Sequence, residues 1–114
     1  MKEIDLHNAV VKYIDLQHKE LLYTSTLGGI YLGANNWKQK NIKKTHYKKG
    51  VPDILIFEAR KGFNGLMLEL KTEKGRLSPH QKKWLKDLNS RNYLALACYG
   101  FYDTIEKLNK YLNV

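Results

Sequence analysis

The chain of 114 residues carries a formal net charge of +9 and 43% hydrophobic residues, a balance that fits one folded domain over residues 1–114 with a single core. No segment has the apolar length that crosses a bilayer, and the first residues lack the order of a signal peptide, so neither a membrane partner nor secretion is expected. Cys98 is the only cysteine, which excludes an internal disulfide and favours a buried, inert thiol in a reducing cytoplasm.

Residues 3–18 are predicted to form the first helix. Glu3, His7, Val10 and Ile14 recur at helical spacing, so Glu3 and His7 are expected on the apolar face beside the aliphatic residues. Glycines interrupt the apolar residues that follow. The sheet's first strand is expected there around residues 30–32.

A basic segment without acidic residues lies between Glu20 and Asp53. Its lysines gather near the end, among aromatic residues: Lys38, Lys40, Lys43, Lys44, Lys48 and Lys49, with Tyr31, Trp37 and Tyr47. Lysines of this kind neutralise backbone phosphates, and aromatic rings stack on unpaired bases. The last four lysines of this set are therefore predicted to bind DNA. The alternative is a solvated loop whose aromatic residues pack in the core.

Two short apolar runs, residues 53–57 and 66–71, are predicted to form the strands of a hairpin. Gly62 and Gly65 lie between them and are expected to supply the turn. The bulky and β-branched residues of these runs are typical of strands.

Two acidic residues and an amine occupy this hairpin. Side chains alternate faces along a strand, so Glu69 and Lys71 share one face. Asp53 begins the neighbouring strand directly after Pro52, which fits a strand's first position. An acid at a strand end beside an acid in mid-strand can share one Mg²⁺ ion, which takes one or two carboxylates and keeps several waters. The alternative is a polar face in contact with solvent.

Ser78 and Pro79 predict a helix start, because Ser favours the N-cap and Pro the first helical position. This helix is expected to end at Asn89 or Ser90. Gln81 falls on its apolar stripe, where an unpaired amide is costly. Gln81 is therefore either a satisfied core amide or a group that reaches a site behind the strand.

Residues 93–99 are predicted to form the next strand, which the helix joins to residues 66–71 in a parallel βαβ unit. The strand is almost wholly apolar and is expected to be buried. Residues 101–112 carry an amphipathic pattern that closes the domain with a last helix.

The pair of motifs Pro52-Asp53 and Glu69-Leu70-Lys71 resembles the signature of the PD-(D/E)XK nucleases. A longer set of residues is similar to the VRR-NUC family, in particular to its stand-alone, phage-like members. The set comprises Gly50-Val51-Pro52-Asp53-Ile54, Leu68-Glu69-Leu70-Lys71, Lys74-Gly75-Arg76-Leu77-Ser78 and Gln81. This resemblance implies an α/β, restriction-endonuclease-like core in which helices flank a mixed sheet, in the order αβββαβα.

The resemblance also implies a mechanism. Asp53, Glu69 and the backbone carbonyl of Leu70 are expected to bind Mg²⁺ or Mn²⁺, which acts as a Lewis acid on the phosphate and lowers the pKa of water. Lys71 is expected to orient that water or to offset charge on the phosphorane. Gln81 is expected to position the water or the lysine.

Residues around this centre complete the predicted site. In the resembled family a Glu early in the first helix, followed four residues later by a Gln, supports the metal centre. Glu3 matches the first of these, whereas His7 stands in place of the Gln, and Asp5 is a rival for the role of Glu3. Lys74 and Arg76, in the loop after the second strand of the hairpin, are predicted to add contacts to DNA.

Three function classes compete. The first is a metal-dependent, structure-selective endonuclease on branched DNA such as four-way (Holliday) junctions, acting as a homodimer and needing no nucleotide cofactor. The others are a nicking or restriction-like nuclease on duplex DNA and a basic nucleic-acid-binding protein without catalysis. Aromatic residues outside the expected core, namely Tyr23, Tyr31 and Trp37, are candidates for the dimer surface. A bacterial or phage-infected host cytoplasm is the expected location.

Overall fold

The computed structural model describes residues 1–26 and 48–114. Its elements are α1 (Glu3–Gln17), β1 (Tyr23–Ser25), β2 (Ile54–Ile56), β3 (Leu66–Lys71), α3 (Pro79–Asn89), β4 (Leu94–Tyr99) and α4 (Phe101–Leu112). Over these residues the elements follow the predicted order αβββαβα. The predictions made for Tyr31, Trp37, Lys43, Lys44 and residues 30–32 lie outside the described residues.

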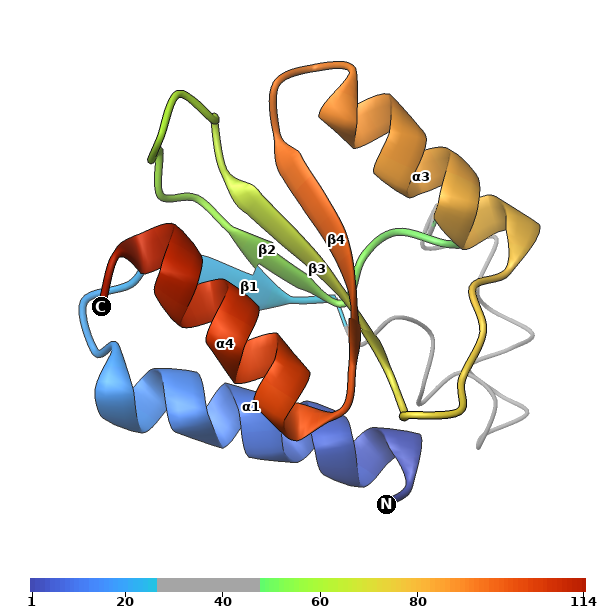
Figure 1. The fold of residues 1–114 in the computed structure, drawn as a ribbon, viewed down its shortest axis with the longest axis horizontal. Helices are drawn as coiled ribbons and strands as arrows, with labels where there is room; N and C mark the ends of the chain where they lie inside the picture. Colours follow the sequence, from blue (N-terminus) through green and yellow to red (C-terminus); the bar gives the residue numbers. More distant parts are fainter. Residues whose placement is uncertain (27–47) are drawn as a thin grey trace.

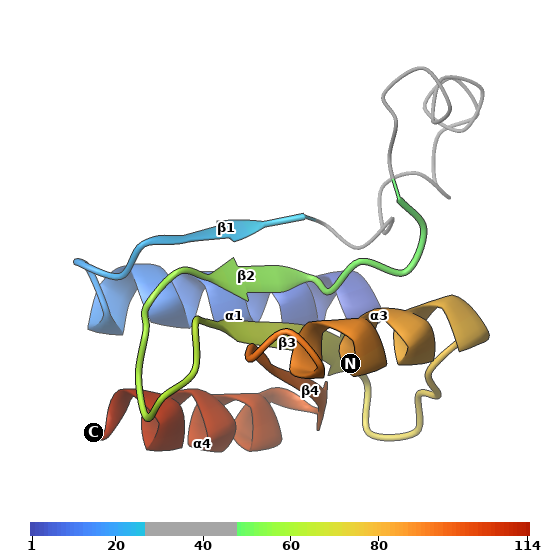
Figure 2. The same ribbon diagram turned by 90° about the horizontal axis from the view of Figure 1, so that it is seen from above.

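The four strands form one mixed sheet in the order β1-β2-β3-β4, as Figure 2 shows from above. The pairs β1–β2 and β2–β3 are antiparallel, whereas β3 and β4 run parallel. Ile54 lies opposite Leu68, so the antiparallel register brings the preceding residue, Asp53, next to Glu69. Strand pairing therefore brings the two predicted metal ligands together.

The described strand that pairs with β2 on this side is Tyr23–Ser25, which lies ahead of residues 30–32, where the first strand was expected. Only three residues form this strand, too few for a pattern of alternating polar and apolar residues to reveal it. Its position depends on pairing with β2, which supplies the hydrogen bonds that a short edge strand cannot make alone.

The helices cover both faces of the sheet (Figure 1). On one side, α1 and α4 pack against the face formed by Leu66, Leu68 and Leu70. On the other side, α3 packs against β4, over the face that carries Glu69 and Lys71. None of the described helices has the length and apolar character needed to cross a membrane.

The apolar stripe of α1 differs from the prediction at its first residue. Leu6, His7, Val10 and Ile14 are buried, but Glu3 is exposed. A carboxylate in the first turn interacts favourably with the positive end of the helix dipole and stays hydrated. The expectation that Glu3 extends the apolar face is therefore wrong, whereas the expectation for His7 is confirmed.

Strand β4 is less buried than its apolar sequence suggested. Only Ala95 and Cys98 are buried in it, and Tyr99 is exposed, because β4 is an edge strand of the sheet. Burial raises the pKa of the Cys98 thiol to about 12, which keeps it protonated and unreactive. The prediction of a buried thiol is confirmed.

The connection between β2 and β3 uses its two glycines differently. Lys61 and Gly62 both have positive φ, of 55° and 85°, and form a tight turn between Arg60 and Phe63. Gly65 has another role, because a Cβ there would lie 2.6 Å from the carbonyl oxygen of Ile56. The prediction that both glycines make the turn is correct only for Gly62.

Candidate active site

Asp53 and Glu69 are buried together where β2 and β3 meet, each only 1% exposed. The Leu70 N–H donates to Asp53 Oδ2 at 2.7 Å, which fixes the Asp53 carboxylate against β3. Burial and then the charge of Asp53 raise the pKa of Glu69 from its usual value of 4.5 to about 9. Because the two carboxyl groups lie close together and are buried away from water, it is unfavourable for both to be ionised without a cation beside them.

One oxygen of Glu69 is left open. Glu69 Oε2 accepts a hydrogen bond, whereas the buried Oε1 has no hydrogen-bond partner among the residues that the structure describes. A buried charged oxygen without a partner is costly. A divalent cation at Oε1 would offset that cost.

Lys71 lies on the same side of the sheet, as the alternation along β3 predicts. Its Nζ is 4.0 Å from Glu69 Oε2, and its side chain is 12% exposed. The lysine lowers the pKa of Glu69, but burial and Asp53 have the larger effect in the opposite direction. The ammonium group of Lys71 therefore lies beside Glu69, but its charge does not outweigh the effects of burial and of Asp53 on that carboxyl group.

Gln81 connects α3 to this site. The Ser78 N–H donates to Gln81 Oε1 at 2.8 Å, and the Gln81 N–H donates to Ser78 Oγ at 3.2 Å, which together form a capping box. The oxygen of the Gln81 amide is therefore occupied, and its Nε2 donates to Glu69 Oε2 at 3.1 Å. The prediction that Gln81 reaches the site is matched by this contact. Sequence reasoning predicted Ser78 as the N-cap but missed the reciprocal bond from Gln81, which the spacing Ser-x-x-Gln could have revealed.

The segment before Asp53 is held against α3. Gly50 has a φ of 93°, and a Cβ there would lie 2.7 Å from the backbone carbon of His80. The indole Nε1 of Trp84 donates to the carbonyl of Lys49 at 3.1 Å. A glycine at position 50 is thus required both by the backbone conformation and by the close approach of the helix.

His7 is a buried residue of α1 that contacts β1. Its Nε2 lies 2.6 Å from Ser25 Oγ, and its buried Nδ1 has no hydrogen-bond partner in the described part of the chain. Burial lowers the pKa of His7, although the negative charges of Asp53 and Glu3 act in the opposite direction. The ring is therefore neutral at physiological pH and acts through hydrogen bonding rather than charge.

Glu3 acts on the site at a distance. Its charge contributes to raising the pKa of both His7 and Glu69, but its side chain is exposed, as is that of Asp5. Within residues 1–26 and 48–114, no three His, Cys, Asp or Glu side chains form a group that could hold a metal ion. Asp53 and Glu69 thus form a two-carboxylate set.

This set fits a hard divalent cation. Mg²⁺ takes one or two carboxylates, adds backbone carbonyls or waters and leaves positions for phosphate oxygens, whereas structural zinc sites prefer Cys and His. Leu70 directly follows Glu69 in β3, and its N–H is already bonded to Asp53. The open Oε1 of Glu69 and the repulsion between the two acids both agree with a bound cation.

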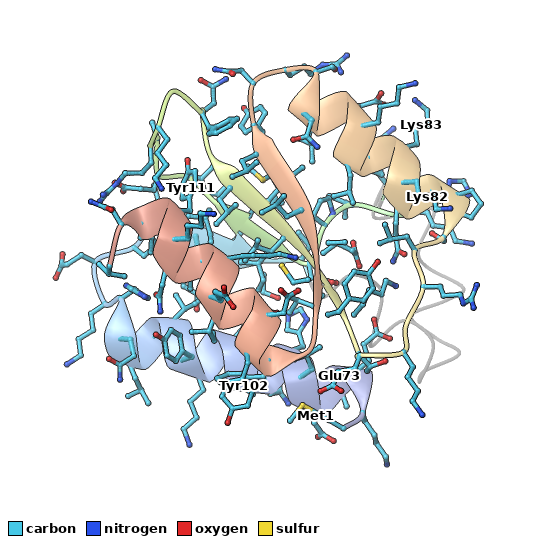
Figure 3. The ribbon with its side chains drawn as sticks, viewed as in Figure 1. Met1, Glu73, Lys82, Lys83, Tyr102 and Tyr111 are labelled. Carbon is cyan, nitrogen blue, oxygen red and sulfur yellow. The ribbon has the colours of Figure 1, made fainter. Side chains whose placement is uncertain are left out.

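The predicted DNA-binding residues that the structure describes form two groups. Lys48 and Lys49 border a groove of about 530 Å³ along α3, together with Lys83 and Arg91. The second group, Lys74 and Arg76, is exposed in the loop between β3 and α3. Figure 3 shows Lys82 and Lys83 on α3. The described basic residues therefore lie on α3 and on the segments that precede and border it.

The sequence matches the VRR-NUC domain over residues 15–102. The chain belongs to the VRR-NUC family. A solved structure described as a VRR_NUC domain protein is similar to it, with a TM-score of 0.78 and 20% sequence identity, over 99% of this chain and 89% of that chain. No curated protein matches the sequence.

Membership identifies this VRR-NUC chain as a nuclease of the PD-(D/E)XK type, with DNA as its implied substrate. The similar structure confirms the α/β, restriction-endonuclease-like fold. The matched residues include Asp53, Glu69, Lys71 and Gln81 but begin after Glu3 and His7. Nucleases of this superfamily typically use divalent metals, in agreement with the donor set.

Replacing Glu69 by Gln tests the burial of the two acids. Because the folded chain without metal binds the Glu69 proton more tightly than the unfolded chain, its free energy of unfolding falls as the pH rises from about 4.5 to about 9. The Glu69→Gln variant should lose this slope and, in chelator at pH 8, melt about 4 °C or more above the wild type. Thermal melts across pH measure both effects.

The exposed Glu106 on α4 provides the control, because Glu106→Gln should keep the wild-type slope. A Glu69→Gln variant that melts below the wild type in chelator at pH 8 would contradict the charge burial described above.

Proposed function

We propose that this VRR-NUC protein is a metal-dependent endonuclease that hydrolyses phosphodiester bonds in DNA, with Mg²⁺ or Mn²⁺ held by Asp53, Glu69 and the backbone carbonyl of Leu70. The observation that carries the proposal is the burial of Asp53 beside Glu69, whose Oε1 has no hydrogen-bond partner among the described residues. Two buried acids serve a cation better than they serve a simple DNA-binding surface, on which they would repel phosphate.

The chain's own residues prepare the site for that cation. The Leu70 N–H holds Asp53, and the Gln81 amide holds Oε2 of Glu69 so that Oε1 stays available. When bound, the cation supplies Lewis-acid polarisation of the phosphate and makes hydroxide accessible near neutral pH. Both carboxylates are then positioned before DNA arrives, which avoids reorganisation during the reaction.

Lys71 supplies positive charge to the reacting phosphate. It lies within 4.0 Å of Glu69 Oε2, and it can donate hydrogen bonds to a phosphate oxygen or to the attacking water. Charge develops on the phosphoryl oxygens in the transition state, so a fixed ammonium stabilises that state more than the ground state. Gln81 acts as a positioning residue through Glu69. From α1, Glu3 contributes its charge and His7 contributes its hydrogen bond to Ser25.

The preferred substrate in this proposal is branched DNA, cleaved by a homodimer. A two-fold dimer presents two equivalent active sites, which suits the symmetry of a four-way junction. The alternatives are nicking or restriction-like cleavage of duplex DNA and DNA binding without cleavage. A comparison of a four-way junction with a linear duplex of the same sequence, in Mg²⁺ and in chelator, separates the three.

Removal of either carboxylate should abolish cleavage. Asp53→Ala and Glu69→Ala each remove a proposed metal ligand but also a charge that repels phosphate, so junction binding should persist. Cleavage rates in Mg²⁺ and Mn²⁺, with binding measured in chelator, test this directly. Glu20→Ala, at an exposed position, serves as the control and should cleave normally. Near wild-type cleavage by either carboxylate variant would refute the assignment.

Substitution of Lys71 should affect mainly turnover, whereas substitution of the lysines between residues 43 and 49 should affect mainly DNA binding. Lys71→Ala should lower turnover far more than affinity, because its charge acts on the reacting phosphate. A variant with Lys43, Lys44, Lys48 and Lys49 all changed to Ala should bind more weakly, with a log–log salt slope flatter by about 0.9 per lost contact on duplex DNA.

Lys12→Ala with Lys19→Ala is the matched control, because both lysines are exposed on the α1 side of the molecule. An unchanged salt slope in the quadruple variant would show that its lysines serve solubility alone.

The active species should be a homodimer, because paired incision of a junction requires two sites at a fixed separation. Sedimentation equilibrium at micromolar concentration should give about twice the monomer mass. Mixing wild-type and Glu69→Ala protein should give dimers that nick one strand without resolving the junction. Paired, simultaneous cuts by a strictly monomeric protein would contradict this arrangement.

A further inference from the structure

A cavity of about 410 Å³ opens beside the catalytic lysine. It is lined by Gly75, Arg76, Leu77, Lys82 and Tyr99. The lining thus combines two cations and one aromatic ring and contains no acidic residue. Such a combination is chemically suited to a nucleotide, whose phosphate carries negative charge and whose base offers a flat face.

The sheet places this cavity next to Lys71. Tyr99 is the residue opposite Lys71 in the parallel pair β3–β4, so both side chains leave the same face of the sheet from strands about 4.8 Å apart. Gly75 closes the turn that follows Lys71, and a Cβ at Gly75 would lie 3.3 Å from Lys71 Cβ and Cδ. The turn that lines the cavity therefore packs directly on the lysine.

Hydrogen bonds fix the backbone at Tyr99, whereas its side chain is partly exposed to solvent. Its N–H donates to Asp103 Oδ2 at 2.8 Å, and the next N–H, of Gly100, donates to the Lys71 carbonyl at 2.8 Å. Within the described part of the chain, the Tyr99 hydroxyl makes no hydrogen bond and the ring contacts no other aromatic ring. The residue is 39% exposed. Tyr111 differs, since its ring is buried and its hydroxyl donates to the Glu58 carbonyl at 2.6 Å.

The cations of the cavity come from two elements. Arg76 belongs to the loop after β3, and Lys82 lies in the first turns of α3 and points outward in Figure 3. Neither makes an ion pair among the described residues, unlike Lys83, which pairs with Asp87 at 2.8 Å. Both therefore keep their charge available for a phosphate.

We propose that Tyr99, Arg76 and Lys82 form a subsite for an unpaired nucleotide next to the scissile phosphate. The base stacks on the Tyr99 ring, and the two cations hold the adjoining phosphate. A base within a duplex has both faces covered by its neighbours, so this subsite selects DNA whose base stacking is interrupted at the cut, as it is at a branch point. The inference rests on the proposed catalytic role of Lys71 and specifies the DNA that its site accepts.

Binding in chelator tests the subsite without any cleavage. Single-stranded oligonucleotides with a central 2-aminopurine and matched duplexes are titrated with Tyr99→Ala, Tyr99→Phe and wild-type protein. Tyr99→Ala should weaken single-strand binding about fivefold or more, the lower end of base–aromatic stacking, and should leave duplex binding within about twofold. Tyr99→Phe should match the wild type in affinity and in quenching of 2-aminopurine, since it keeps the ring.

Tyr102→Ala is the control, because this tyrosine is 85% exposed and lies on α4, outside the cavity. Arg76→Ala with Lys82→Ala should weaken binding and flatten its salt dependence. Unchanged single-strand binding by Tyr99→Ala, equal losses for single strand and duplex, or a loss in Tyr99→Phe would each overturn the subsite. Continued cleavage by Asp53→Ala would instead overturn the proposed metal site while leaving these binding results intact.

Discussion

The burial of Asp53 beside Glu69 is the constraint on which the rest of this site depends. Removing two carboxylates from water is expensive, and their mutual repulsion adds to that cost. Two described groups donate hydrogen bonds to the pair, the Leu70 N–H and the Gln81 amide, and the Lys71 ammonium lies 4.0 Å from Glu69. A hydrogen bond to a charged group offsets about 1.5 to 3 kcal/mol of the cost. The proposed cation would offset the remainder.

Several features of the sequence that look local serve this pair of acids. The Ser78–Gln81 capping box starts α3 and at the same time orients the amide that binds Glu69. Gly50 lets the chain pass close to His80 on its way to Asp53. The helix start and the glycine therefore support the candidate active site, although neither supplies a proposed metal ligand. Stability and function depend on the same contacts at these positions.

The sequence predicted those parts of the molecule that depend on local patterns. The bounds of β3, the Ser78 cap and the shared face of Glu69 and Lys71 all follow from periodicity and capping preferences. Helical spacing predicted the burial of His7 but not the exposure of Glu3. Spacing shows which residues share one face of a helix, but it does not show where the helix extends beyond the core. A strand of three residues such as β1 is too short to show an alternation of polar and apolar residues.

The partners of each strand were harder to predict. Tyr99 lies next to Lys71 only because β4 pairs in parallel with β3 in one particular register, and the sequence of an apolar strand is compatible with several registers. The contact between His7 and Ser25 likewise joins a helix to a strand that the sequence did not reveal. Long-range pairing, rather than residue chemistry, is what sequence reasoning lacked.

The parallel pairing of β3 with β4 also affects when the enzyme can become active during synthesis. Asp53, Glu69, Lys71 and Gln81 all leave the ribosome before β4 does, because β4 begins only at Leu94. Until β4 emerges, one side of β3 has no strand to pair with, and the carbonyl of Lys71 lacks the bond from Gly100. A nascent chain therefore carries the reactive groups without the framework that aligns them.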